Sequence, residues 1–138
     1  MAKADISPEA ALSGKSSYPP PHDAKLAGRK SWPITRQFGL TQFGVNRVEL
    51  PPGAWSSNRH WHRANDEAVI VISGELVLVT DQGEEVLRAG DCVCFKAGVP
   101  DAHHQTSILE GSTAGALLVY VGSNKRGVSH APRCPYLG

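Results

Sequence analysis

The chain has 138 residues, of which 41% are hydrophobic and 20% charged, as expected for one globular domain with its own core. Fourteen basic and thirteen acidic residues leave a formal charge of +1, which argues against nucleic acid or an anionic membrane as partner. No apolar run approaches the roughly 18 residues of a membrane span, and the N-terminus lacks a secretory signal. We therefore expect a cytoplasmic protein.

Residues 1–30 show no sustained hydrophobic periodicity and include the run Pro19-Pro20-Pro21. They predict an irregular N-terminal arm, either disordered or laid along the edge of the domain. Residues 30–40 are compatible with a short strand. The first firm strand is predicted over 43–50, which is rich in β-formers and ends at the rigid turn Pro51-Pro52-Gly53.

Short segments rich in β-branched residues then alternate with turn residues such as Ser73-Gly74 and Asp81-Gln82-Gly83. The predicted strands are 68–72, 75–80, 84–88, 92–95, one that starts near His103, and 114–122. About eight short strands without a convincing helical pattern predict an antiparallel sandwich or barrel. We expect a barrel domain over residues 31–122 and an irregular C-terminal tail over 123–138.

Three cysteines without a secretory signal predict reduced thiols rather than a disulfide framework. Cys92 and Cys94 lie two apart on a predicted strand and so share a face, while Cys134 lies in the tail. A C-x-C pair alone is a weak cue for metal or redox chemistry. Packing of two small side chains in the sheet is the simpler interpretation.

The sequence His60-Trp61-His62, followed after four residues by Glu67, carries the main chemical signal. In an extended strand His60 and His62 share one face and Trp61 points to the other. A short bend from Arg63 would let the next strand begin at Glu67, with its carboxylate beside the two imidazoles. Two nitrogen ligands and one oxygen ligand are the start of a metal site.

The order Gly53, His60-x-His62, Glu67 and Gly74 resembles the first signature motif of the cupin superfamily, with one additional residue after the first glycine. The second motif is resembled less closely. Its counterpart comprises Gly90-Asp91, Phe95, Ala97-Gly98 and the pair His103-His104, with Lys96 in place of the usual proline and Asp101 at the nominal histidine position. The resemblance covers roughly residues 43–122 and is closest to small single-domain bacterial cupins.

This resemblance implies an all-β double-stranded β-helix, or jelly roll, with irregular terminal arms. It also implies a metal held inside the barrel by His60, His62, Glu67 and His103. A two-residue insertion in the turn would make His103 the third imidazole. Four alternatives stay open. The third imidazole could be His104, its place could be taken by Asp101 or by no protein ligand, and Asp66 could bind instead of Glu67.

Three imidazoles and a carboxylate suit a divalent transition metal such as Fe, Mn, Ni, Zn or Cu, and leave a coordination position open. The resemblance implies a metalloenzyme of dioxygenase, isomerase, decarboxylase or lyase type that acts on a small polar carbonyl or carboxylic acid substrate. The alternative is a non-catalytic module that binds or senses a small ligand, since fold alone does not decide function. No catalytic residue besides the metal ligands is evident.

Other residues near the motifs have weaker assignments. Trp55 and Trp61 are expected to pack on the far side of the histidine strand. Arg59, Lys96 and Gln105 either border a pocket for an anionic ligand or belong to the solvated surface. A homodimer is expected, because a jelly roll leaves open sheet edges that a partner or the N-terminal arm can cover.

Overall fold

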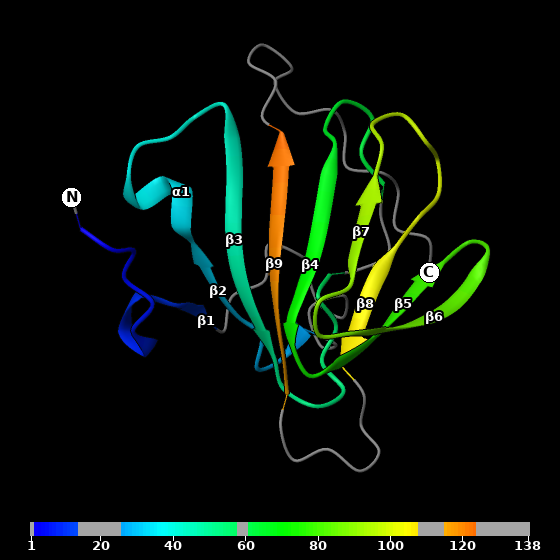
Figure 1. The fold of residues 1–138 in the computed structure, drawn as a ribbon, viewed down its shortest axis with the longest axis horizontal. Helices are drawn as coiled ribbons and strands as arrows, with labels where there is room; N and C mark the ends of the chain where they lie inside the picture. The colour runs from blue at the N-terminus through cyan, green and yellow to red at the C-terminus, as the bar shows by residue number, and fades with distance from the viewer. Residues whose placement is uncertain (1, 14–25, 58–60, 108–114, 124–138) are drawn as a thin grey trace.

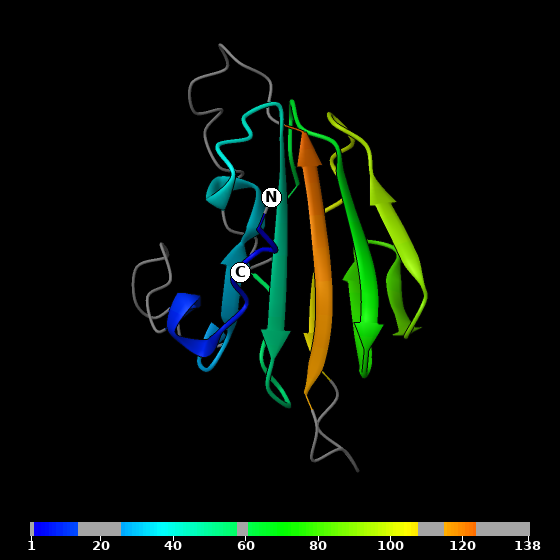
Figure 2. The same ribbon diagram turned by 60° about the vertical axis from the view of Figure 1, so that its left-hand side comes forward.

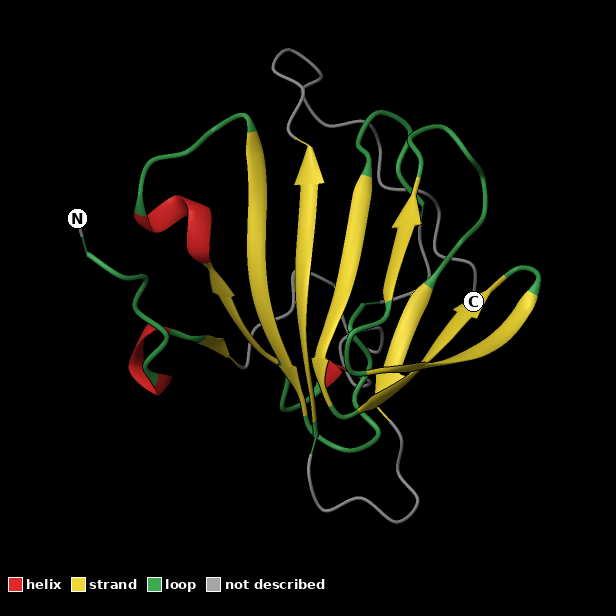
Figure 3. Ribbon diagram, in the orientation of Figure 1, coloured by secondary structure: helices red, strands yellow, loops and turns green. Residues whose placement is uncertain are grey.

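The computed structural model describes residues 2–13, 26–57, 61–107 and 115–123. Strands dominate the described chain, and its two helices are a single turn each (Figure 3). None of the helices described is long and apolar enough to cross a membrane. The elements are η1 (Pro8–Ala10), β1 (Leu12–Ser13), β2 (Lys30–Pro33), α1 (Ile34–Gln37), β3 (Phe43–Leu50), β4 (Glu67–Ser73), β5 (Glu75–Thr80), β6 (Gly83–Arg88), β7 (Cys92–Phe95), β8 (His104–Ser107) and β9 (Ala116–Ser123).

The strands form two antiparallel sheets (Figure 1). The larger sheet has the order β1-β2-β3-β9-β4-β7, and the smaller has the order β6-β5-β8. The last strand, β9, lies in the middle of the larger sheet between β3 and β4, as both views show (Figure 2). Non-consecutive strands are thus neighbours, which is the topology of a jelly roll and confirms the predicted fold class.

The core lies between the two sheets and follows from the alternation of side chains along each strand. In β4 the side chains of Val69 and Val71 are fully buried, and in β5 those of Leu76 and Leu78 face them across the barrel. Val48 and Leu118, paired across β3 and β9, complete the centre of this cluster. The apolar alternation therefore fixes which face of each strand can carry an interior functional group.

The chain before β2 is attached to the edge of the larger sheet where it is described. Strand β1 pairs with β2, and the Trp32 indole N–H donates a 2.8 Å hydrogen bond to the Ser7 carbonyl. The Gln37 side chain of α1 accepts from the Asp5 backbone N–H and donates to its carbonyl. These contacts lay residues 5–13 along the sheet edge, while 14–25 and the tail 124–138 lie outside the described residues.

Gly74, the glycine that closes the first motif, is required by the tight turn between β4 and β5. Its φ is +79°, a conformation that residues with a Cβ adopt rarely. A Cβ at this position would also lie 2.8 Å from the Gly115 carbonyl oxygen and 2.9 Å from the Ala116 Cα. The motif glycine thus lets the turn pack against the start of β9.

The prediction that His60 and His62 lie on one strand is wrong at the residues described. Trp61 and His62 belong to no strand. The neighbour of His62 is the turn after β7, whose Gly98 N–H donates a 2.8 Å hydrogen bond to the His62 carbonyl. A turn offers one such bond and no ladder, so residues 61–66 before β4 form a loop.

Candidate metal centre

Three of the four predicted ligands come together at one end of the barrel. Glu67 is the first residue of β4, where the sequence placed it, His62 lies on the loop before it, and His103 lies immediately before β8. His60 lies outside the described residues. The site is therefore formed by a loop and by two strands that belong to different sheets.

Both described imidazoles direct their Nε2 atoms at the Glu67 carboxylate. The distance from His62 Nε2 to Glu67 Oε2 is 3.1 Å, and that from His103 Nε2 to Oε1 is 3.4 Å. The two ring centroids are 6.4 Å apart. Each carboxylate oxygen thus faces a different ring, and the three side chains converge on one small volume.

Neighbouring groups hold His103 in place. Its side chain is 2% exposed, and its ring stacks on Phe95 with centroids 3.6 Å apart and an interplanar angle of 8°. Its Nδ1 lies 3.3 Å from the Asp101 carbonyl oxygen, which accepts a hydrogen bond when Nδ1 carries a proton. Such an outer contact is how proteins orient a ligating imidazole and leave Nε2 to the metal.

Glu67 remains ionised over the ordinary pH range. Burial by itself raises the pKa of its carboxyl, but hydrogen bonds from His103 and His62 and the charges of these rings outweigh burial and lower the pKa to about 2. A carboxylate and two imidazoles are ligands that divalent transition metals prefer. The chemistry of the donor set therefore fits a metal of this kind.

The described side chains do not form a ready-made metal cage. In the ranges that the structure describes, no group of three His, Cys, Asp or Glu side chains is spaced to hold an ion as it stands. The Glu67 carboxylate lies between the two rings as their hydrogen-bond acceptor. A cation held here would replace these ring protons, and its fourth predicted ligand, His60, is not among the described residues.

The alternative ligands have other contacts. His104 lies on the opposite face of β8 from His103 and stacks on Trp55, with centroids 4.0 Å apart. The Asp66 carboxylate accepts a 2.8 Å hydrogen bond from the Ala97 N–H, and that of Asp101 accepts a 2.9 Å bond from the Asp81 N–H. These contacts favour His103 and Glu67 over the alternatives.

A buried polar network beside the site was not recognised from sequence. The Gln105 side-chain oxygen accepts hydrogen bonds from Ser56 Oγ, at 2.9 Å, and from the Tyr120 hydroxyl. Burial raises the pKa of Tyr120 well above its ordinary value, and the nearby Glu67 charge raises it further. Gln105 lies two residues after His103, and this spacing could have placed both on the interior face.

The amide nitrogen of Gln105 has an unusual environment. The residue is 1% exposed, and its Nε2 has no hydrogen-bond partner among the described residues. A buried donor without an acceptor is rare, because its desolvation is not compensated. Gln105 is thus an interior residue and not a surface one.

A pocket of about 250 Å³ opens beside the candidate centre. His62 and His103 line it from the inside, and Trp61, Phe95 and Lys96 form other parts of its wall. Of the two positions expected for Lys96, a pocket border or the solvated surface, the structure shows the pocket border. Arg59 lies outside the described residues. Trp61 was expected on the far side of the histidine strand, but it lines the pocket, and neither Trp61 nor His62 belongs to a strand.

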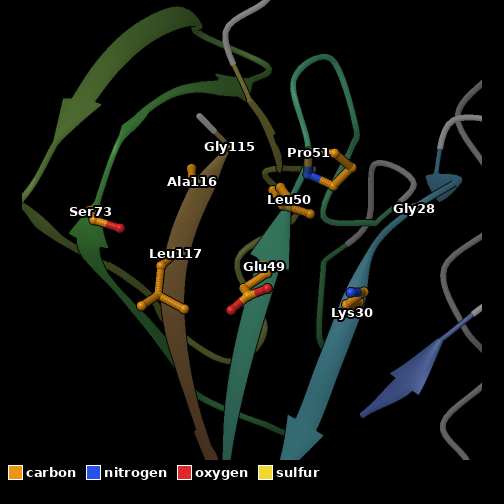
Figure 4. Close-up of a pocket in the computed structure, with 9 residues that line it drawn as sticks. All are labelled: Gly28, Lys30, Glu49, Leu50, Pro51, Ser73, Gly115, Ala116 and Leu117. Atoms are coloured by element: carbon orange, nitrogen blue, oxygen red, sulfur yellow. The ribbon is translucent and has the colours of Figure 1, made fainter. Parts of the chain in front are cut away.

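A second pocket, of about 350 Å³, lies at the other end of β9 (Figure 4). Its charged lining residues are Lys30 and Glu49, which are paired across β2 and β3. It contains no histidine or cysteine, and backbone at Gly115 and the apolar Leu117 form much of its wall. Although this pocket is larger, its lining lacks metal-ligand chemistry, so we place the candidate site at the smaller one.

The Cupin domain family matches residues 46–122, which is more than half of the chain. No curated protein matches the sequence. Among solved structures, a sugar phosphate isomerase of the cupin superfamily from Silicibacter pomeroyi is 41% identical, with a TM-score of 0.80 over 90% of this chain and 76% of that one.

Two more distant structures share the fold. An RmlC-like cupin from Shewanella frigidimarina is 22% identical, with a TM-score of 0.56 over 72% of this chain and 79% of its own. The polyketide cyclase RemF from Streptomyces resistomycificus is 19% identical, with a TM-score of 0.63 over 99% of this chain and 81% of its own.

Proposed function

The chain belongs to the cupin family, and on that premise we propose that it is a metal-dependent isomerase that acts on a small phosphorylated sugar or a similar polar carbonyl compound. The observation that carries the proposal is the convergence of His62 Nε2 and His103 Nε2 on the two oxygens of Glu67 beside a pocket. The substrate class is taken from the 41% identical protein, which is described as a sugar phosphate isomerase.

In this proposal His60, His62, Glu67 and His103 hold a divalent transition metal. Such a metal, when bound, supplies a Lewis acid that polarises a carbonyl or hydroxyl oxygen. Glu67 contributes a negative charge that stays in place at neutral pH, because its pKa is lowered to about 2. The Asp101 carbonyl and the Phe95 ring hold His103 in one orientation.

The pocket offers a recognition group for an anion. Lys96 on the wall provides a positive charge for an anionic group, such as the phosphate of a sugar phosphate. The imidazoles of His62 and His103 line the same pocket, so a metal held by them would lie beside the bound substrate. A small polar substrate with an anion at one end matches this arrangement.

The first test is metal analysis of freshly purified protein, followed by NMR of aldose and ketose phosphates with the metal-free and metal-loaded forms. We expect stoichiometric metal and interconversion of at least one aldose–ketose pair by the loaded form alone. His62→Ala should weaken metal binding by more than about 100-fold, because loss of a ligand exceeds the cost of losing an outer contact. His22→Ala, in the N-terminal arm, is the matched control.

Two results are decisive against the proposal. Protein without stoichiometric metal, or with metal retained after His60→Ala and His62→Ala, would eliminate the metal centre. Metal-loaded protein that binds a sugar phosphate without converting it would instead support the alternative, a module that binds or senses a small ligand.

We also propose that the protein is a homodimer. The larger sheet ends in two short edge strands, β1 with two residues and β7 with four, whose outer backbone groups can pair with another chain. Light scattering coupled to gel filtration should give twice the mass of one chain. A single-chain mass at micromolar concentration would contradict this part of the proposal.

A further inference from the structure

Strand β7 carries two thiols that the candidate metal centre does not use. Cys92 and Cys94 are both exposed, and β7 is an edge strand of the larger sheet. Between and after them, Val93 and Phe95 pack against the core, so alternation directs both thiols to the other face. The expectation that these cysteines pack in the sheet core is therefore wrong.

The two thiols leave the same face of one short strand, two residues apart, and are open to solvent. Across the ladder Cys92 is paired with Ile70 and Cys94 with Ala68, so the neighbouring strand places no charged side chain opposite either sulfur. Two polarizable sulfurs side by side among apolar groups form a ligand set for a soft cation.

The same features disfavour a redox role. Cysteines that sense oxidants have a lowered pKa, whereas desolvation and then the adjacent Cys94 thiol raise the pKa of Cys92, so a cation that binds there has to displace the thiol protons. Alternate residues of a strand are roughly 6.6 Å apart at Cα, near the upper limit of what a disulfide spans. Two cysteines that bind a cation need no sulfur–sulfur bond, so their spacing fits cation binding better than it fits a disulfide.

We propose that Cys92 and Cys94 together bind Cu(I), or a soft cation of the same kind, through their two sulfur atoms. Each thiol gives up its proton, two Cu–S bonds form, and no oxidation of protein or metal takes place. Thiolate ligands select Cu(I) over the harder divalent ions that imidazole and carboxylate ligands favour. The protein thus has two metal sites of different chemistry.

The dithiol site lies next to the pocket of the candidate centre. Cys94 lines this pocket together with His62 and His103. By alternation the thiol itself points away from the face of the strand that carries Phe95, and Cys92 is not among the lining residues. The site stands on residues that the proposed function does not use, so either proposal can fail without the other.

The test is titration of the reduced protein with Cu(I) under nitrogen, in competition with a chromophoric Cu(I) chelator. The wild type should take one Cu(I) per chain from the chelator, and both Cys92→Ser and Cys94→Ser should lose this binding. Cys134→Ser is the matched control and should bind as the wild type does. His62→Ala should also retain binding, because the imidazole centre is a separate site.

X-ray absorption at the copper edge provides a second readout, with sulfur-only coordination as the expected result. Far-UV circular dichroism checks that the two exposed serine variants remain folded. The proposal is overturned if the wild-type protein cannot compete with the chelator. It is also overturned if the Cys92→Ser and Cys94→Ser variants both still bind Cu(I), or if the absorption spectrum shows nitrogen ligands.

Discussion

At the scale of single residues, Glu67 is the group on which the candidate centre depends. Its two oxygens each accept from a different imidazole, and these contacts keep the carboxyl ionised although it is largely buried. A buried carboxylate stays ionised only when a positive charge compensates its own charge. At Glu67 this positive charge is carried by the two rings or by a bound metal.

Glu67→Gln should weaken the binding of a divalent metal by about 100-fold or more, because the amide keeps the shape of the side chain and removes its charge. Asp66→Asn is the matched control. The neighbouring carboxylate accepts a hydrogen bond from the Ala97 N–H through Oδ1, and asparagine retains that oxygen. Competition with a fluorescent chelator measures both affinities, and equal losses in the two variants would refute the assignment of Glu67.

Tyr120 should remain protonated at alkaline pH. Its pKa is raised by burial, so a difference spectrum between the wild type and Tyr120→Phe should show no phenolate near 295 nm at about pH 11, above the ordinary tyrosine pKa. Phenolate from this residue should appear only on unfolding. Ordinary titration of Tyr120 near pH 10 would show that the phenol is not held in the interior.

The sign of the accompanying stability change follows from the raised pKa of Tyr120. Above about pH 10 the unfolded chain loses this proton while the folded chain keeps it, so the free energy of unfolding falls as pH rises. The contribution of Tyr120 is complete below that pH. Urea unfolding should therefore show a smaller alkaline loss in Tyr120→Phe than in the wild type.

At the scale of elements, the turn between β4 and β5 illustrates why a motif contains a glycine. Gly74→Ala should lower the free energy of unfolding by more than about 1 kcal/mol, through positive φ and through the collision with Gly115 and Ala116. Gly39→Ala is the matched control, with a φ of +70° and no atom within 4 Å of the added Cβ. Urea unfolding measures the free energy of unfolding of both variants. The amount by which the loss in Gly74→Ala exceeds that in Gly39→Ala is due to the steric collision.

Strands with strong local signals could be predicted closely from the sequence. The bounds of β3, β5 and β7 are those expected from β-branched runs closed by turn residues. The H-x-H pattern wrongly predicted a strand at His62. A strand needs a neighbouring strand as hydrogen-bond partner, and the His62 carbonyl instead accepts from the Gly98 N–H in a turn. Local pattern therefore predicts a strand only where the topology provides a neighbouring one.

The candidate site could be predicted only in part for a related reason. The first motif gave His62 and Glu67, and an assumed two-residue insertion in the second gave His103, and these three side chains do converge. Tyr120 could not be found, because it comes from β9, and its position beside the centre depends on β9 pairing with β4. Strand order in a sheet is not encoded in spacing along the chain.

At the scale of the whole molecule, both sheets contribute to the apolar core and both contribute to the candidate centre. The apolar core occupies the middle of the barrel, and polar groups gather at the end where β4 begins and β7 ends. The pocket and the candidate centre lie at this end, and Cys94 of β7 is among the residues that line the pocket. One end of the barrel thus carries all the metal-ligand chemistry that we assign among the described residues.

The most direct test of the central claim is a crystal structure of the metal-loaded protein with anomalous diffraction at the edge of the bound metal. The account predicts one strong peak in contact with His62 Nε2, His103 Nε2 and the Glu67 carboxylate, with His60 as a further ligand. A stoichiometric metal located elsewhere, with Glu67 still hydrogen-bonded to both rings, would contradict it.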